Sequence, residues 1–315
     1  MKRLGVIGTM VWDTIYRVGR DEPEEEWGGI AYALAALDAA LPAGWELVPL
    51  VKVGRDLASR GTAFLRGLER CAPTARFIEV PEANNRVTLR YRSLERRSEQ
   101  LVAGVPGWHW SELGPFVQEL DAIYCNLISG FELDLATAMR LRHAFRGPMY
   151  ADLHSLLLGL RADGTRAPRI VPRIAEWFGC FDAVQVNEAE MALLGDDPLA
   201  VAATAFDAGV RLLVVTLADR GAVYFAQGEP DLSAFPRPTA AGPLRTARLP
   251  AQLAADVRDP TGCGDVFGAT LMAQLLRQAP IEEGIRSAHR AAARNVEHLG
   301  ATHLRAHLRG EILHR

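Results

Sequence analysis

Towards its C-terminal end the chain reads Asp259-Pro260-Thr261-Gly262-Cys263-Gly264-Asp265, and the helix-compatible apolar run Val266–Met272 follows. Two glycines that flank one small residue at a helix start allow consecutive backbone N–H groups to converge on an anion. The helix dipole favours negative charge at the same place. The segment therefore predicts a phosphate cradle made of Gly262, Cys263 and Gly264.

The residue after the cradle is a carboxylate. Asp265 is expected in the first helical turn, where the dipole favours its ionised form and it can accept a proton from a hydroxyl. A cradle beside a base indicates phosphoryl transfer. The same residues also fit a plain glycine-rich turn, with Asp265 as an ordinary carboxylate at a helix start. From these residues alone, both interpretations stay open.

Composition limits the classes of protein that the chain can belong to. Its 315 residues, 49% of them hydrophobic, are enough for a large core, and we expect one α/β domain over residues 1–315. The net charge of -3 gives no indication of nucleic acid or of an anionic membrane as a partner. The 4 cysteines lack CxxC spacing, which argues against a zinc site or a disulfide framework and fits a reducing compartment.

The first apolar stretch of the chain stops at Asp13, which is too early for a signal-peptide core and its cleavage site. We interpret this stretch as a buried strand. No stretch approaches the roughly 20 apolar residues that span a bilayer. The expectation is therefore a cytoplasmic protein whose partners are small molecules, with no nucleic acid and no membrane.

Apolar runs rich in Val, Ile and Leu alternate with helical patterns. The runs are Leu4–Ile7, Leu47–Val53, Ala122–Ile128, Met149–Leu153, Ala183–Val186 and Arg211–Leu217. Most lack polar alternation, as expected for strands covered on both faces. The main helical patterns are Ile30–Leu41, Asp134–Phe145, Glu188–Leu194, Leu199–Ala208, Asp265–Gln278, Ile281–His298 and Thr302–Arg309. This order predicts an α/β fold with a doubly wound, mainly parallel sheet flanked by helices.

The segment Asn85–Arg92 breaks this rhythm. Val87, Leu89 and Tyr91 alternate with polar residues, which is typical of a half-exposed strand. Together with Arg76–Val80 before it and Gln100–Ala103 after it, the segment predicts a small antiparallel sheet that projects from the main domain. A surface hairpin is the alternative.

Four motifs carry a resemblance to a known family. The segment Asp259–Asp265 resembles the DTxGAGD signature of the ribokinase-like (PfkB) carbohydrate kinases, with Cys263 in place of a small alanine. Gly28-Gly29-Ile30-Ala31 resembles the double-glycine motif of that family, and Asn187-Glu188-Ala189-Glu190 resembles its NxxE motif. The segment Val215–Gly221 resembles its VTxGxxG motif. These motifs occur in the order of the family.

The resemblance implies an ATP-dependent kinase that phosphorylates a hydroxyl of a sugar or sugar derivative. Asp265 would be the base, and Gly262, Cys263 and Gly264 would form the anion hole. The residues that it implies for substrate binding are Asp13, Gly28, Gly29 and Asp259. It also implies a small β lid, with insertions at approximately 14–27 and 75–105, through which a homodimer could form.

The cofactors that the resemblance implies are ATP and Mg²⁺. The residues that it places at the cofactor are Asn187, Glu190, Thr216, Gly221, Thr261 and His289. Glu190 would hold magnesium through water, which suits a cation that keeps several waters and needs few carboxylates. Asn187 and Glu190 also fit a helix cap with its capping box, and both roles are compatible.

The chain departs from the family pattern at several positions. Ala33 stands where an asparagine usually holds sugar hydroxyls, and Ala218 replaces a glycine of the nucleotide segment. His154 follows Asp152 where relatives often carry Asp-x-Asn. A nucleoside kinase of the same family is therefore one alternative, and a catalytically silent ligand-binding relative is another. A dehydrogenase or P-loop enzyme lacks support, since neither GxGxxG nor GxxxxGK[ST] occurs.

Overall fold

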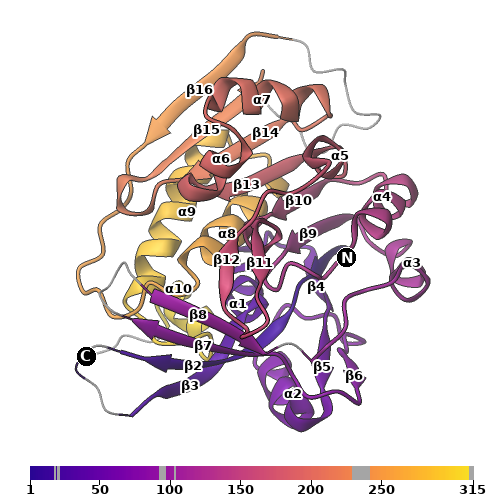
Figure 1. Cartoon of the computed structure of the whole chain (residues 1–315), viewed down its shortest axis with the longest axis vertical. Helices are drawn as coiled ribbons and strands as arrows, with labels where there is room; N and C mark the ends of the chain where they lie inside the picture. The colour runs from indigo at the N-terminus through magenta and orange to yellow at the C-terminus, as the bar shows by residue number, and fades with distance from the viewer. Residues whose placement is uncertain (18, 20–21, 92–96, 103, 229–241, 312–315) are drawn as a thin grey trace.

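A computed structural model describes the chain except for residues 18, 20–21, 92–96, 103, 229–241 and 312–315. Its centre is an eight-stranded sheet in the order β16-β15-β14-β13-β10-β9-β1-β4 (Figure 1). The strands are β1 (Lys2–Ile7), β4 (Trp45–Leu50), β9 (Ala122–Asn126), β10 (Met149–Asp152), β13 (Ala183–Asn187), β14 (Leu212–Thr216), β15 (Ala222–Gln227) and β16 (Leu244–Leu249). The six strands from β4 to β14 are mutually parallel. The predicted fold class is confirmed.

Strand β15 and the edge strand β16 extend the sheet with antiparallel pairing and were not predicted. In β16 exposed and partly buried side chains alternate, and only Leu249 is buried. An edge strand of this composition has little of the continuous apolar run that marks a strand covered on both faces. The run Leu47–Val53 was predicted as one strand, but it divides into β4 and β5 (Lys52–Gly54).

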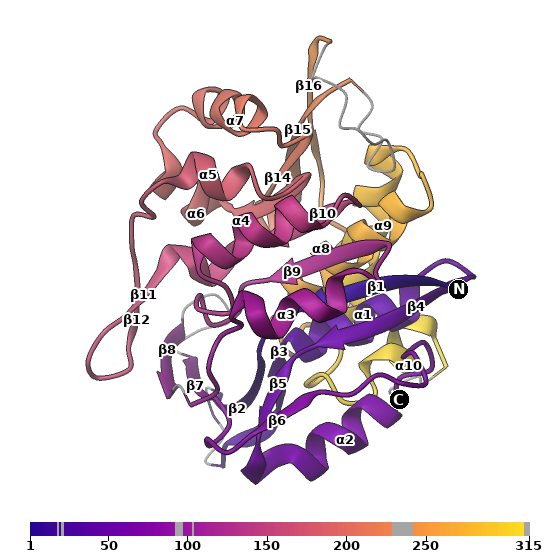
Figure 2. The ribbon, with the colours of Figure 1, turned by 90° about the vertical axis from the view of Figure 1, so that its right-hand side faces the viewer.

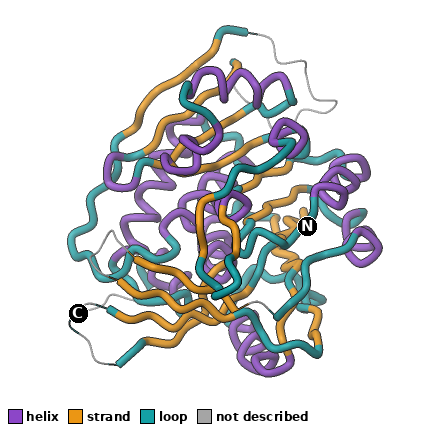
Figure 3. The backbone as a smooth tube through the Cα atoms, in the orientation of Figure 1, coloured by secondary structure: helices purple, strands orange, loops and turns teal. Residues whose placement is uncertain are grey.

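Helices cover both faces of the sheet, as Figures 2 and 3 show. The core on one face includes side chains of α1 (Ile30–Ala40), α2 (Ala58–Arg66), α8 (Cys263–Leu276), α9 (Ile281–Val296) and α10 (Leu304–Arg309). The core on the other face includes side chains of α3 (Trp110–Val117), α4 (Leu135–Ala144), α5 (Ile174–Phe178), α6 (Glu188–Leu194) and α7 (Pro198–Asp207). Among the described residues, no helix has the length and apolarity required to cross a membrane.

A four-stranded sheet, here called the lid sheet, lies apart from the central one in Figure 1. Its order is β3-β2-β7-β8, from β2 (Met10–Tyr16), β3 (Glu24–Gly29), β7 (Arg86–Tyr91) and β8 (Arg97–Val102). The alternation predicted for β7 is confirmed, since Val87 and Leu89 are buried while Arg86 and Arg90 are exposed. The core of the lid sheet consists of these two buried residues, Val87 and Leu89, together with Val11, Ile15 and Leu101.

Two parts of the lid prediction were wrong. The sheet is not wholly antiparallel, because the outgoing strands of two hairpins, β2 and β7, lie side by side in parallel. Arg76–Val80 is not part of it. Its strand β6 (Ile78–Val80) pairs in parallel with β5 instead, and Ile78 N donates to Val51 O at 3.0 Å. The β2–β3 hairpin occupies the place next to β7. A further hairpin, β11 (Leu158–Leu160) with β12 (Arg166–Pro168), reaches the lid sheet through a bridge between Gln100 and Thr165.

Candidate active site

The cradle predicted from sequence forms the start of α8. Gly262 is the N-cap of this helix and has a φ of 78°, a left-handed conformation that favours glycine. A Cβ at this position would also overlap the ring of Tyr32. The first amides of a helix have no carbonyl of a preceding turn to bind, so they are available for an anion. The loop and the start of the 14-residue helix α8 therefore have the backbone arrangement that an anion site requires, and anion binding there stays a prediction.

Asp265 lies in the first turn of α8, as predicted, and its side chain is half-buried. Asn126, the last residue of β9, donates its side-chain amide to Asp265 Oδ1 at 2.6 Å. Asn126 is completely buried, so its orientation is fixed by packing. Sequence reasoning missed Asn126. The signal for it was a polar residue at the end of an apolar run, at the sheet edge where ligands of such folds bind.

Gln185 is a second residue that sequence reasoning missed. Its side-chain amide donates to Gly264 O at 3.0 Å and to Asp152 Oδ2 at 2.8 Å, while its own carbonyl accepts from Tyr150 at 2.8 Å. A Cβ at Gly268 would come within 2.6 Å of that carbonyl, so α8 needs a glycine there to approach β13. Gln185 thereby ties the cradle backbone to the central sheet.

Asp152, His154 and Glu190 form a charged cluster beside the cradle. His154 Nδ1 lies 2.6 Å from Glu190 Oε1. Burial lowers the pKa of His154, but the charge of Glu190 and its hydrogen bond outweigh burial and raise that pKa to about 10. Burial and the charge of Glu190 raise the pKa of Asp152 to about 8. The cluster therefore favours an imidazolium at His154, held against Glu190, and disfavours a charge on Asp152.

Asn187 and Glu190 form the capping box that their spacing suggested. Asn187 Oδ1 accepts from Glu190 N at 2.9 Å, and Glu190 Oε2 accepts from Asn187 N at 2.7 Å. Glu190 is only 4% exposed. In the sheet register Asn187 stands opposite Thr216, so the NxxE motif and the nucleotide segment meet at adjacent strand ends.

The residues predicted to bind substrate lie at the base of the lid sheet. Asp13 in β2 is buried, and a Cβ at Gly28 in the neighbouring strand β3 would overlap its carboxylate. Gly29 has a φ of 59° and caps α1, and a Cβ there would lie 2.6 Å from Thr9 O. Each glycine is thus required by a close approach. Ala33, the departure from the family pattern, is fully buried in α1.

Tyr32 connects the substrate end of the site with the cradle. Its ring packs on Gly262, and its buried hydroxyl has no hydrogen-bond partner among the residues that the structure describes. Burial raises the pKa of Tyr32 well above its ordinary value, and the charges of Asp259, Asp13 and Asp265 raise it further. The carboxylates predicted for substrate and for catalysis therefore surround one side chain.

Asp259 is 1% exposed and directs one of its two carboxylate oxygens into its own loop. Its Oδ1 accepts from Thr261 N at 2.9 Å and from Thr261 Oγ1 at 2.6 Å. The substrate-binding role of Asp259 stays a prediction, as does the role of Thr261 at the cofactor. Through its Oδ1 atom, Asp259 thus fixes the backbone amide and the hydroxyl of Thr261.

Two of the residues predicted at the nucleotide, Gly221 and His289, contact the backbone of Leu249 at the end of β16. Gly221 has a φ of 97°, and a Cβ there would overlap the carbonyl oxygen of Leu249. His289 in α9 is buried, and its ring centroid lies 5.1 Å from that of Phe267. Burial lowers the pKa of His289, against a hydrogen bond to the Leu249 backbone that raises it. Ala218 has a φ of 53°, so it occupies a conformation that suits the family's glycine.

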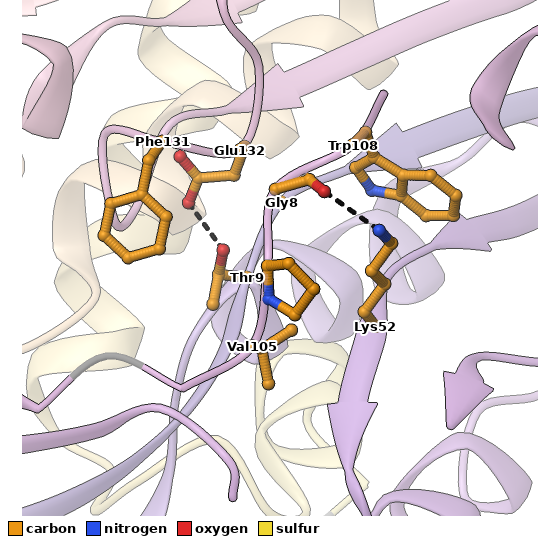
Figure 4. A pocket seen from close by; sticks show the side chains of 9 residues that line it. Gly8, Thr9, Lys52, Val105, Trp108, Phe131 and Glu132 are labelled. Carbon is orange, nitrogen blue, oxygen red and sulfur yellow. Dashed lines mark hydrogen bonds between the residues drawn. The ribbon is translucent and has the colours of Figure 1, made fainter. Parts of the chain in front are cut away.

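A small cavity of about 10 Å³ lies beside Thr9, Lys52 and Glu132 and was not predicted (Figure 4). Thr9 Oγ1 donates to Glu132 Oε1 at 2.7 Å, and Lys52 Nζ donates to Gly107 O at 2.9 Å. Lys52 also pairs with Glu112 at 2.9 Å. These polar groups form hydrogen bonds and ion pairs with one another. We therefore interpret them as a network that fixes the backbone of Thr9, whose carbonyl oxygen lies close to Gly29.

Comparison with known proteins gives a match to one family model. Residues 161–307, just under half of the chain, match the pfkB family carbohydrate kinases. That range contains the cradle, the NxxE segment and the nucleotide segment. A search of curated proteins gives no match.

Solved structures match over nearly the whole chain. A pyrophosphate-dependent kinase of the ribokinase family, in complex with a pyrophosphate analogue and myo-inositol, has a TM-score of 0.74 at 18% identity over 94% of this chain and 96% of its own. Ribokinase from Arabidopsis thaliana, with ribose and ATP, has a TM-score of 0.70 at 19% identity over 98% and 97%. A nucleoside kinase from Burkholderia thailandensis, with inosine, has a TM-score of 0.72 at 15% identity over 98% and 97%. The fold is that of the ribokinases, and the predicted family resemblance is confirmed.

Proposed function

We propose that this chain, which matches the pfkB family carbohydrate kinases over residues 161–307 and has the ribokinase fold, transfers the γ-phosphate of ATP to a hydroxyl of a sugar or sugar derivative. The observation that carries the proposal is Asp265 in the first turn of α8, beside the Gly262 cradle and hydrogen-bonded to Asn126. A carboxylate and an anion site at one helix start are the two elements that phosphoryl transfer to a hydroxyl requires.

In the proposed reaction Asp265 accepts the proton of the acceptor hydroxyl. The hydroxyl oxygen forms a bond to the γ-phosphorus, the bond from that phosphorus to the β,γ-bridging oxygen breaks, and ADP leaves. The amides at Gly262–Gly264 and the dipole of α8 stabilise the negative charge on the transferred group. The lid sheet excludes water, which would otherwise compete as the acceptor.

Glu190, whose carboxylate contacts His154 and Asn187 in this structure, is the residue that would hold magnesium through water. Among the described residues, no group of three His, Cys, Asp or Glu side chains could hold a metal. Mg²⁺ binds proteins through one or two carboxylates together with substrate phosphates, so Glu190 with Asn187 beside it is sufficient. When bound, the ion would neutralise charge on the donor phosphates.

A nucleoside kinase of the same family is the second candidate. It is favoured by Ala33, which removes the amide that commonly holds sugar hydroxyls in relatives. The nucleoside kinase from Burkholderia thailandensis, with its bound inosine, supports this alternative by fold. Both candidates use Asp265 in the same way and differ only in the acceptor.

The proposal is tested by incubating the purified protein and Mg²⁺ with a panel of sugars, polyols and nucleosides. ATP and pyrophosphate are supplied as donors in parallel, because one fold relative is pyrophosphate-dependent. Phosphorylated acceptors are identified by mass spectrometry. We expect an acceptor-dependent product with ATP that is absent in Asp265→Asn. A product in that variant at the wild-type rate would exclude Asp265 as the base, and a product only with pyrophosphate would refute ATP as the donor.

A further inference from the structure

The cradle loop has a buried carboxylate that it does not neutralise by itself. Asp259 is 1% exposed and receives two hydrogen bonds from Thr261, which are neutral donors. A buried carboxylate is costly unless a cation pairs with it. The cation comes from the lid sheet, where Arg17, the residue after β2, places Nη2 2.8 Å from Asp259 Oδ2.

Arg17 holds three groups at once. In addition to Asp259, its Nε lies 2.8 Å from Glu24 across the β2–β3 hairpin, and its Nη1 donates to Arg258 O at 3.2 Å. Burial would lower the pKa of Arg17, but hydrogen bonds and charges from Asp259 and Glu24 raise it above its ordinary value. The guanidinium is therefore a fixed cation that joins the lid hairpin to the cradle loop.

A second lid strand contacts the same loop. The Tyr91 hydroxyl, at the end of β7, lies 2.7 Å from Thr261 Oγ1. Because Thr261 Oγ1 already donates to Asp259, Tyr91 is the donor in this pair. Arg17 also lies over the Tyr91 ring, 6.0 Å from its centroid.

On its other side the loop is held by the main domain. The amides of Arg258 and Asp259 donate to Val296 O at 2.9 and 3.0 Å, and Asn295 Nδ2 donates to Thr261 O at 2.8 Å. These contacts belong to α9 and do not depend on the lid sheet. The contacts from Arg17 and Tyr91 exist only while the lid sheet lies against the loop.

We propose that Arg17 is a positioning residue for the anion cradle, supplied by the lid sheet and assisted by Tyr91. When the lid sheet lies on the loop, Arg17 fixes Asp259, Asp259 fixes the Thr261 amide and hydroxyl, and the amides at Gly262–Gly264 face the transferred group. Closure over the acceptor and assembly of the anion site are then one event. The kinetic consequence of this inference rests on the proposed function. The order of the loop, in contrast, can be measured without turnover.

The test compares two buried Arg–Asp pairs. Arg17→Gln removes the pair with Asp259, and Arg305→Gln removes a matched pair with Asp38, 3.1 Å apart in the core of α1 and α10. The arginine and aspartate side chains are 13% and 1% exposed in the first pair, and 11% and 0% exposed in the second. Because the two pairs are buried to a similar extent, we expect the two variants to lose comparable stability. A kinetic difference between them then reports on the cradle.

We expect Arg17→Gln to lower kcat by about tenfold or more, with the KM of the acceptor within about threefold. Arg305→Gln should keep kcat within about twofold of the wild type. Tyr91→Phe, which removes one hydroxyl and is safe for folding, should lower kcat by about threefold. Equal kcat values in Arg17→Gln and Arg305→Gln would overturn the proposal.

Hydrogen exchange measured by mass spectrometry gives a readout without turnover. The peptide over residues 258–264 should exchange about tenfold faster in Arg17→Gln than in the wild type, and at the wild-type rate in Arg305→Gln. Unchanged exchange in Arg17→Gln would refute the coupling even if the enzyme is a kinase. If the wild type phosphorylates no acceptor, the proposed function fails, while the exchange result still decides the coupling.

Discussion

Asn126 donates its amide to Asp265 at 2.6 Å across the junction between β9 and α8. A base acts in the right direction only if its carboxylate is held in one orientation, and the fully buried Asn126 supplies this restraint. The proposed base is therefore positioned by the central sheet as well as by its own helix. This relationship leads to the first prediction.

Asn126→Leu keeps the volume of the side chain and removes the donor. We expect kcat to fall by about 10- to 100-fold, because a misplaced base loses the geometry of proton transfer. The KM of the acceptor should stay within about threefold, since Asp13 and Gly28 are untouched. Steady-state kinetics with the acceptor found in the panel checks both values.

Thermal denaturation of the same variant separates a positioning effect from a loss of folded protein. The assay temperature is chosen well below the melting temperature of Asn126→Leu. A kcat within twofold of the wild type under these conditions would show that Asn126 does not orient the base.

Asp265→Asn preserves shape and removes the base itself. We expect phosphoryl transfer to fall by about 10²- to 10⁴-fold, the range that positioned general bases contribute. Binding of ATP, measured by calorimetry, should remain, because the cradle binds through backbone amides. Asp256→Asn is the control, since Asp256 is an exposed residue upstream of the cradle whose ion pair is with Arg258. Loss of ATP binding in Asp265→Asn would contradict this division of roles.

The sequence predicted the parts of the site that are local in the chain. The cradle, the capping box of Asn187 and Glu190, and the glycines that need unusual backbone conformations are each contained in a few consecutive residues. Asn126, Gln185 and Arg17 were missed because their partners lie 139, 79 and 242 residues away along the chain. Only the sheet order and the position of the lid sheet bring these residues to the cradle.

The same distinction applies to the fold. Continuous apolar runs identified the parallel strands, whose burial on both faces leaves a strong signal. The lid sheet was identified only in part. Its strand β2 was missed because the two core residues Val11 and Ile15 stand on either side of the polar residue Asp13, which interrupts the apolar pattern. Strand β6 pairs with β5 and not with the lid sheet. This choice depends on tertiary contacts, which cannot be predicted from the sequence of a three-residue strand.

The cluster of Asp152, His154 and Glu190 predicts how stability depends on pH. The pKa of Asp152 is raised from 3.8 to about 8, and that of His154 from 6.5 to about 10. For each group, the folded protein therefore binds more protons than the unfolded chain at any pH between the unfolded and the folded pKa of that group. Stability is complete below the unfolded pKa and is lost as the pH rises through the folded pKa.

We expect the free energy of unfolding to fall between pH 7 and pH 10 by about 1–2 kcal/mol from this cluster, after allowance for solvent around the partly exposed His154. Urea denaturation at a series of pH values measures the fall. In His154→Asn the neutral amide should flatten this part of the profile. A variant profile parallel to that of the wild type would contradict the assignment of the charge to His154.

Ala218 predicts a gain in stability from a single substitution. It adopts a φ of 53° although it carries a Cβ, and this conformation costs an L-residue about 1–2 kcal/mol. Its side chain is exposed, so little packing is lost when the methyl group is removed. Ala218→Gly should raise the free energy of unfolding by about 0.5–1 kcal/mol, because relief of strain exceeds the entropy that glycine adds to the unfolded chain.

Two controls test whether backbone conformation is the cause. Ala200→Gly makes the same change at an exposed position in α7, where the backbone is helical, and should lower stability by about 0.5–1 kcal/mol. Gly221→Ala should lower it by more, because the φ of 97° and the carbonyl of Leu249 both exclude a Cβ. Opposite signs for Ala218→Gly and Ala200→Gly in urea denaturation would establish that the nucleotide segment retains a glycine conformation. Equal signs would mean that the strain at Ala218 is relieved elsewhere in the turn.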